Sequence, residues 1–207
     1  MSESALRFSI LDLAPDDEET IGQAATLLVE GFEDNWPDAW PTEEDALQEV
    51  REALGEGRIC RVALGEDGAV LGWIGGIPSY EGKVWELHPL VVRTDLRRRG
   101  IGRALVADLE ARVGERGALT LWLGTDDDTG MTTLSGVDLY PDVLGHLANI
   151  QNVRGHPYEL YLKLGFSING AMPDANGWGK PDIYMAKRCR RDRGKERARN
   201  SMLRARY

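Results

Sequence analysis

The sequence predicts a single domain of the α/β class, built on a mixed, mainly antiparallel sheet with flanking helices. Three apolar runs joined by short turn sequences, between residues 59 and 92, are typical of an antiparallel meander. Segments with apolar residues at helical spacing precede and follow this meander. The 207 residues are enough for one domain with a sizeable core, and no internal repeat or linker divides them.

The N-terminal part is predicted to hold one strand and two helices. Alternating apolar residues over 6–10 favour a strand. Acidic residues favour a helix start because they interact well with the helix dipole, so a helix is predicted over 18–32. Thr42 followed three positions later by Asp45 resembles a capping signal, and the helix after it should end near Gly55.

The remaining elements follow from apolar spacing and from turn residues. Strands of the meander are predicted over 59–64, 70–77 and 84–92. An arginine- and glycine-rich loop then leads into a helix whose apolar residues run from Ile101 to Val113. Further elements are predicted as a strand over 119–123, helices over 138–149 and 157–164, and strands over 167–171 and 183–187.

Composition excludes several classes of protein. No apolar run approaches the length of about 20 residues that a membrane-crossing helix needs. The N-terminus has no basic start with an apolar stretch behind it, so we expect a cytoplasmic protein without a secretory signal. Cys60 and Cys189 lie far apart, which argues against a disulfide framework, and the three histidines have no metal-binding spacing. We expect no metal.

Charge is distributed unevenly along the chain. The net charge of −9 divides into +8 for residues 187–207 and −17 for the rest. A body this acidic repels nucleic acid and attracts small cations, so a cationic ligand is expected. The basic tail, residues 188–207, is predicted to be a solvated disordered extension of a domain at 1–187. Contact of the tail with RNA, with an anionic surface or with the acidic body is the alternative.

The loop after the meander has the features of a phosphate-binding site. Helix N-termini present free N–H groups and the positive end of the helix dipole, and glycine allows close approach of the backbone. Guanidinium groups add charge-assisted hydrogen bonds. The alternative is a solvated basic helix start. The residues expected to bind phosphate are Arg97, Arg98, Arg99, Gly100, Ile101, Gly102 and Arg103.

The pattern Arg-x-x-Gly-x-Gly between a strand and a helix resembles the acetyl-CoA loop of the GNAT N-acetyltransferase superfamily. The segment 161–166, Tyr-Leu-Lys-Leu-Gly-Phe, is similar to the Tyr-x-x-x-Gly-Phe segment late in these domains. Longer stretches resemble chromosomal aminoglycoside 6'-N-acetyltransferases of the enterococcal type; they are 85–92, 123–127, 132–135, 156–159 and 173–183. The resemblance implies a GNAT fold, with a sheet split in a V where acetyl-CoA enters, and a homodimer.

The resemblance also assigns catalytic roles. An amine that attacks a thioester must be neutral, so a proton acceptor is needed beside it. Glu86 is the candidate base, acting directly or through water, and His88 would orient the substrate or relay a proton. By resemblance, the backbone N–H of Leu90 would bind the thioester oxygen, and Tyr161 would donate a proton to the leaving thiolate. Residues 90–92 (Leu90, Val91 and Val92) would bind the cofactor. The alternatives are that Glu86 is an ordinary surface glutamate, that His88 is structural and that Tyr161 is a core residue.

Substrate recognition is expected to depend on carboxylates, because an aminoglycoside carries several ammonium groups. Each acidic candidate could equally be a loop cap or a solvated group, and the aromatics could simply pack against the body. The candidates are Asp126, Asp127, Asp128, Asp138 and Asp182, with Trp36 and Tyr80 as possible walls. The predicted function is acetyl transfer to the 6'-amine of aminoglycosides. There are two alternatives. The acetyl acceptor could be another cationic amine, or the protein could bind acyl-CoA without turnover.

Overall fold

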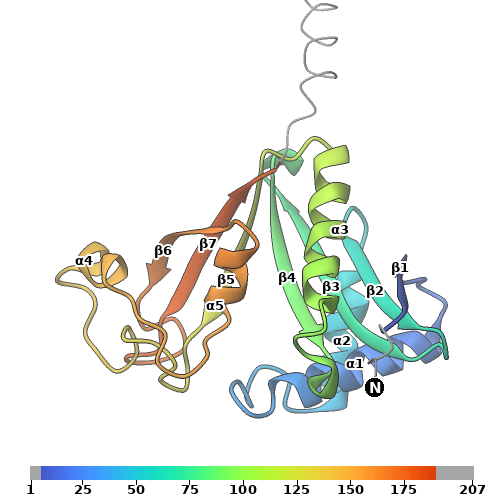
Figure 1. The fold of residues 1–207 in the computed structure, drawn as a ribbon, viewed down its shortest axis with the longest axis horizontal. Coiled ribbons are helices and arrows are strands. Elements are labelled where there is room, and N and C mark those ends of the chain that lie inside the picture. Colours follow the sequence, from blue (N-terminus) through green and yellow to red (C-terminus); the bar gives the residue numbers. More distant parts are fainter. Residues whose placement is uncertain (1–5, 190–207) are drawn as a thin grey trace, which may run out of the picture.

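A computed structural model describes residues 6–189, in which two groups of strands meet at one end and spread apart at the other (Figure 1). The first group and its helices are β1 (Phe8–Asp12), α1 (Glu18–Phe32), α2 (Glu43–Ala53), β2 (Ile59–Gly65), β3 (Val70–Ser79), β4 (Val84–Val92) and α3 (Ile101–Glu115). The second group comprises β5 (Thr120–Asp126), α4 (Val143–Ala148), α5 (Tyr158–Lys163), β6 (Ser167–Met172) and β7 (Asp182–Arg188). Short 3-10 turns lie at Tyr80–Gly82 and Thr94–Leu96.

The described strands form one sheet in the order β1-β2-β3-β4-β5-β7-β6. Each neighbouring pair is antiparallel except β4 and β5, which run parallel. That parallel pairing covers three residues, Val84–Glu86 against Thr120–Trp122, and the two strands diverge beyond it (Figure 1). The expected mixed, mainly antiparallel sheet and its split are therefore confirmed.

An irregularity in β4 lies just after the last residue that pairs with β5. Ile74 of β3 lies opposite Leu90, whereas Gly76 lies opposite Leu87, so β4 holds one extra residue at this point. A Cβ at Gly75 would collide with the carbonyl oxygen of His88, which means that glycine makes room for the bulge. Pro89, which has no N–H to donate to the sheet, lies within this bulge.

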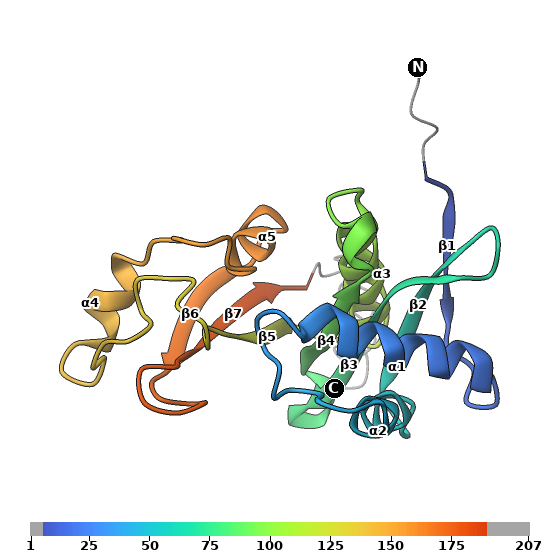
Figure 2. The same cartoon turned by 90° about the horizontal axis from the view of Figure 1, so that it is seen from below.

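Helices cover the two faces of the sheet separately. Helix α3 lies on one face of β2–β4, while α1 and α2 lie on the other (Figure 2). Consequently the buried side chains form two clusters, one including Leu105, Leu109 and Leu121, the other including Leu28, Val50 and Trp73. The helix boundary 18–32 and the cap at Thr42, which accepts a hydrogen bond from the Asp45 N–H, are as predicted.

Some predicted boundaries are wrong. Helix α4 is six residues long, not the twelve predicted over 138–149, because Pro141 precedes it and the Asp142 side chain caps it by accepting from the Gly145 N–H. Strand β5 continues to Asp126 because β7 pairs with it along its whole length. At the C-terminal end, Cys189 is fully buried and donates its N–H to Leu119. The predicted basic tail otherwise falls on 190–207, outside the described residues.

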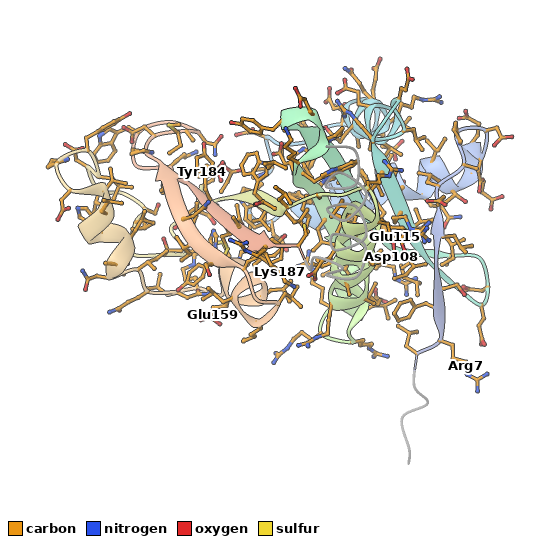
Figure 3. All side chains as sticks on the ribbon, turned by 90° about the horizontal axis from the view of Figure 1, so that it is seen from above. Arg7, Asp108, Glu115, Glu159, Tyr184 and Lys187 are labelled. Atoms are coloured by element: carbon orange, nitrogen blue, oxygen red, sulfur yellow. The ribbon has the colours of Figure 1, made fainter. Side chains whose placement is uncertain are left out.

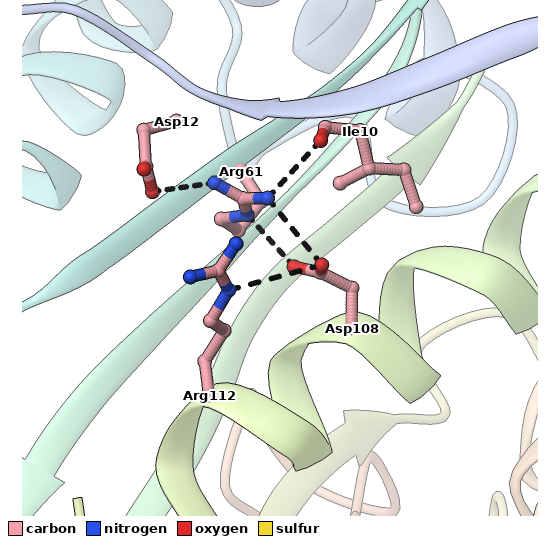
Figure 4. Close-up of polar contacts among 5 residues, drawn as sticks. All are labelled: Ile10, Asp12, Arg61, Asp108 and Arg112. Atoms are coloured by element: carbon pink, nitrogen blue, oxygen red, sulfur yellow. Dashed lines mark hydrogen bonds and ion pairs between the residues drawn. The ribbon is translucent and has the colours of Figure 1, made fainter. Parts of the chain in front are cut away.

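Charged side chains fix the layers at two places. Arg61 of β2, 3% exposed, forms ion pairs with Asp12 at 2.6 Å and with Asp108 of α3 at 2.7 Å, and it also donates to the Ile10 carbonyl (Figure 4). Lys187 lies where β7 approaches α3, farther along the strand than Tyr184 (Figure 3). It donates to Glu110 at 2.6 Å and to the Leu164 carbonyl at 2.8 Å, which joins the two groups of strands at their closed end.

Two further observations concern residues 6–189 only. No helix there is both long and apolar enough to cross a bilayer. Over the same range, no three His, Cys, Asp or Glu side chains are arranged to hold a metal ion.

Candidate active site

The arginine–glycine loop ends in an open helix N-terminus. Gly100 has φ +92°, a left-handed conformation that glycine adopts without strain, and it precedes the first residue of α3. No side chain of the described structure caps α3, and its first turn holds no acidic residue. The Ile101 side chain is buried and anchors the helix, while Gly102 lies beside Val92. The first-turn N–H groups are thus left for an anion.

The arginines of this loop have different surroundings. Arg97, Arg98, Arg99 and Arg103 are all exposed. Arg97 donates to the Gly31 carbonyl at 2.9 Å, so part of its guanidinium holds the loop against α1. Arg98 has φ +66°, which turns the chain sharply into the helix. Four guanidinium groups beside an uncapped helix start form a strongly cationic surface.

The backbone of β4 presents free groups on the side where β5 has moved away. The Arg93 N–H donates to Leu71 of β3 at 2.9 Å. Because N–H direction alternates along a strand, the Leu90 and Val92 N–H groups point away from β3, toward the open side of the sheet. Val91 points its N–H toward β3, and its side chain is buried against α1. Leu90 and Val92 therefore suit cofactor binding, whereas Val91 is a core residue.

Glu86 and His88 lie on the face of the sheet that α1 and α2 cover, opposite to α3. Glu86 is the last residue of β4 that pairs with β5, and it lies opposite Trp122. Burial raises the pKa of its carboxyl, and His88 and Arg58 offset part of that effect. A higher pKa makes this carboxylate a better proton acceptor near neutral pH.

Carboxylates line the end of the second group of strands. Asp182 of β7 lies opposite Asp126 of β5, and burial together with the charge of Asp126 raises the pKa of the Asp182 carboxyl to about 7. Burial likewise raises the pKa of Asp128. The Oδ1 atoms of Asp128 and Asp182 are buried and have no hydrogen-bond partner among the described residues. Such groups are costly unless a cation or donor joins them.

Gly124 makes room for Asp182. Its position on β5 places an ideal Cβ 2.5 Å from Asp182 Oδ2, too close for any side chain. Any larger residue here would displace the carboxylate.

The main chain at Asp126 is held from both groups of strands. Its carbonyl accepts from Trp36 Nε1 at 3.0 Å, so the loop between α1 and α2 reaches across to β5. His156 Nε2 contacts the same carbonyl at 3.0 Å, and its Nδ1 accepts from the Tyr158 N–H. Burial lowers the pKa of His156, which keeps the ring neutral with its proton on Nε2.

Three of the predicted substrate-contact residues lie away from Asp126, Asp128 and Asp182. Asp127 is fully buried and accepts from the Met131 N–H and from the Thr132 N–H and hydroxyl, so it is a structural carboxylate. Asp138 is exposed and accepts from the Tyr140 N–H. Tyr80 is 78% exposed and lies at the β3–β4 turn, near the end of β5 that pairs with β4. Asp126 lies at the other end of β5, six residues or about 20 Å away.

Tyr161 lies on α5, on the α3 side of the sheet. It is 8% exposed, and its ring packs edge-on against Phe166 with centroids 5.7 Å apart. Burial raises the pKa of its phenol, which makes the hydroxyl a weaker acid and keeps it protonated as a hydrogen-bond donor.

Several residues of the site gave no recognisable signal in the sequence. Trp122 and Tyr184 pack edge-on, with centroids 5.8 Å apart, on the face that carries Glu86 and Asp182. Glu49 of α2 reaches His88. Alternation along β5 and β7 would have placed the two aromatics, once the register between the strands was known.

Three solved structures are similar to the chain in sequence and in fold. An aminoglycoside 6'-N-acetyltransferase complexed with coenzyme A is 41% identical, with TM-score 0.80 over 88% of this chain and 97% of that one. The aminoglycoside 6'-N-acetyltransferase from Enterococcus faecium is 42% identical, with TM-score 0.77 over the same shares. An aminoglycoside 6'-acetyltransferase type Ii is 35% identical, with TM-score 0.66 and again the same shares.

No curated protein matches the sequence significantly. The profile of the acetyltransferase (GNAT) family, in contrast, matches residues 23–134, which include both the bulged strand β4 and the arginine–glycine loop. The chain belongs to the acetyltransferase (GNAT) family.

Proposed function

We propose that this chain is an aminoglycoside 6'-N-acetyltransferase, which moves the acetyl group of acetyl-CoA directly to the 6'-amine. The observation that carries the proposal is the position of Glu86 where β4 and β5 separate, on the same face as the half-buried carboxylates of Asp126 and Asp182. Solved structures 35–42% identical to the chain are aminoglycoside acetyltransferases, which supports the same substrate class.

The chain fits acetyl-CoA on one side of the split. The uncapped N-terminus of α3 and the exposed arginines Arg98 and Arg99 would hold the diphosphate, and the free N–H groups of Leu90 and Val92 would hold the pantetheine arm. Bound acetyl-CoA supplies an acetyl group activated as a thioester. The protein contributes binding, orientation and proton handling.

Glu86 is the proposed base. An ammonium group must lose a proton before it can attack, and the half-buried Glu86 carboxylate, with its raised pKa, accepts that proton directly or through water. On the other face, the Leu90 N–H stabilises negative charge on the carbonyl oxygen, and the protonated Tyr161 donates to the departing sulfur. No covalent enzyme intermediate is needed, and Cys60 and Cys189 are both buried away from this site.

Asp126, Asp128 and Asp182 would hold the other ammonium groups of the substrate. The unpartnered Oδ1 atoms of Asp128 and Asp182 gain charge-assisted hydrogen bonds when an ammonium enters, and the repulsion between Asp182 and Asp126 falls. Asp138, as a carboxylate, and Tyr80, as a wall, remain predicted substrate contacts.

We also propose that the enzyme is a cytoplasmic homodimer. The resemblance to GNAT aminoglycoside acetyltransferases supports the dimer, and acetyl-CoA is made and used inside cells. Sedimentation of the full chain tests the dimer, and a monomer at micromolar concentration would contradict it. Fractionation of the producing cells tests the location.

The function is tested by following CoA release with kanamycin, which has a 6'-amine, and with paromomycin, which has a hydroxyl there. We expect turnover with kanamycin and a product acetylated at the 6' position. Spermidine and a lysine-rich peptide test the alternative acceptors, and a higher kcat/KM with either would replace the proposal. Release of CoA with none of these amines would favour an acyl-CoA-binding module.

Glu86→Gln gives the matched test of the base. The variant should lower kcat by about 10²-fold or more while the Kd for acetyl-CoA changes little, because the amide cannot accept a proton. Equal losses in turnover and in acetyl-CoA binding would reject the assignment.

A further inference from the structure

His88 is held between two side chains that come from outside its own strand. Its Nε2 lies 3.7 Å from Oε1 of Glu49 on α2. Its ring lies 6.0 Å from the ring of Trp40, centroid to centroid, at an interplanar angle of 47°. Trp40 in turn packs edge-on against Phe32, at 4.7 Å. The imidazole is therefore bounded by a carboxylate and by an aromatic ring that is itself fixed.

We propose that Glu49 is a positioning residue, which sets the tautomer and the orientation of His88 beside the candidate base Glu86. The proposal rests on the proposed function, because the role of His88 is defined by that reaction. Glu49 does not act on the substrate in this scheme; it acts through the imidazole.

The packing of α2 explains why Glu49 is available for this role. Ala46, Val50 and Ala53 bury one side of the helix against the sheet, and Glu49 lies at the border of that side, with 18% of its side chain exposed. The other acidic residues of α2, such as Glu44 and Glu52, are exposed. A largely buried carboxylate needs a partner, and His88 is the group that the structure puts within ion-pair range.

The other charged groups near His88 are of both signs. Glu86 lies two residues earlier on the same strand, and its carboxyl interacts with both His88 and Arg58, the residue just before β2. Glu49 is the acidic group that approaches from α2. Removing it leaves Glu86 and Arg58 in place, so its effect on His88 can be measured separately.

The chemical consequence concerns the two ring nitrogens. A carboxylate facing Nε2 favours a proton on that nitrogen, which leaves Nδ1 of the neutral ring as an acceptor. The 3.7 Å separation is about 0.8 Å longer than a typical N–H···O hydrogen bond, and catalytic contacts commonly tighten when substrate binds. An acceptor held at Nδ1 can orient a substrate N–H group toward the centre where Glu86 takes the proton.

Nitrogen-15 NMR of the full chain tests the contact without any reaction. The chain has three histidines, His88, His146 and His156, so the imidazole signals can be assigned by substitution. Glu49→Gln should redistribute the tautomers of His88 in spectra recorded at pH 8. Glu52→Gln makes the same change in charge at an exposed position of the same helix and should leave them unchanged. Identical His88 signals in the wild type and in Glu49→Gln would overturn the proposal, even if the protein acetylates aminoglycosides.

Kinetics then test whether Glu49 works through His88. Glu49→Gln should lower kcat/KM for kanamycin by about tenfold, with the KM for acetyl-CoA unchanged. In a His88→Ala background the same substitution should change kcat/KM by less than about twofold, since its target is gone. A further tenfold loss in that background would mean that Glu49 acts independently, and the positioning role would be wrong. If no aminoglycoside is acetylated, the proposed function fails, and the NMR result still decides whether Glu49 sets the tautomer.

Discussion

Replacing Gly124 by alanine should damage substrate binding with little effect on folding. The added Cβ would lie 2.5 Å from Oδ2 and 2.8 Å from Oδ1 of Asp182, whereas ordinary contacts begin at 3.4 Å. The carboxylate must therefore move by about 0.9 Å or rotate. Asp182 Oδ1 has no hydrogen-bond partner among the described residues, so moving that oxygen breaks no hydrogen bond.

The size of the effect follows from the interaction that is lost. A hydrogen bond to a charged group contributes about 1.5–3 kcal/mol. Complete loss of one ammonium contact would thus weaken binding by about 10- to 150-fold. We expect a rise of about tenfold in the KM for kanamycin, because a displaced carboxylate keeps part of its attraction. Gly124 has an ordinary φ, so alanine gains about 0.4–1 kcal/mol from reduced freedom of the unfolded chain, which offsets part of the steric cost.

Steady-state kinetics with both substrates check this prediction. The KM for kanamycin should rise, while the KM for acetyl-CoA and the melting temperature should stay close to those of the wild type. The control is an Asp182→Ala background, in which Gly124→Ala should have no further effect on the KM for kanamycin. A tenfold rise that persists without the Asp182 carboxylate, or an equal rise in the KM for acetyl-CoA, would refute the steric argument.

Three other predictions concern stability and cofactor binding. Arg61→Ala removes the close partner of Asp108 beneath α3 and, among the described residues, leaves it only the Arg112 guanidinium at 3.9 Å. The variant should destabilise the protein by about 2–3 kcal/mol, measured by urea unfolding; a loss below about 0.5 kcal/mol would contradict the structural role of the ion pairs. The pKa of Asp182 is raised from 3.8 to about 7, so between these pH values the native state binds a proton that the unfolded state does not. The native state therefore loses stability as the pH rises from about 4 to 7. Asp182→Asn should raise the melting temperature at pH 8 and not at pH 4. Gly100→Ala places a side chain at φ +92° and should lower the stability of the protein by about 1–2 kcal/mol. It should also weaken acetyl-CoA binding several-fold, measured by calorimetry. Unchanged affinity would mean that this loop does not bind the diphosphate.

Local signals in the sequence were sufficient for the first half of the fold. The capping residue Thr42 and the helix 18–32 depend on neighbouring residues, so spacing alone located them. The boundary of α4 was misjudged because apolar residues over 137–150 pack onto the core from a mostly irregular segment, which gives spacing close to that of a longer helix. Turn chemistry at Pro141 and Asp142 decides the actual start.

For the candidate site, the sequence could supply residues along one strand and not residues that packing brings together. Glu86 and His88 are two positions apart on β4, and alternation correctly places them on one face. Glu49 reaches His88 from a helix about forty residues away, and its sequence surroundings are those of any acidic helix. Likewise, Asp127 is one of three consecutive aspartates whose different roles depend on which of them turns into the core.

The split of the sheet separates two surfaces of opposite charge. On the α3 side, helix N–H groups and arginines favour a diphosphate; toward α1 and α2, Glu86, Asp126 and Asp182 favour an amine. If β4 and β5 were paired along their full length, the Leu90 and Val92 N–H groups would be used in the sheet and no passage would join the two faces. Divergence after Glu86, next to the bulge at His88, therefore puts the proposed proton acceptor at the edge of the opening, where in the proposed reaction an acetyl group from one face would meet an amine from the other. Under the proposed mechanism, regular pairing of β4 with β5 beyond Glu86 would abolish acetyl transfer while every charged side chain stayed in place.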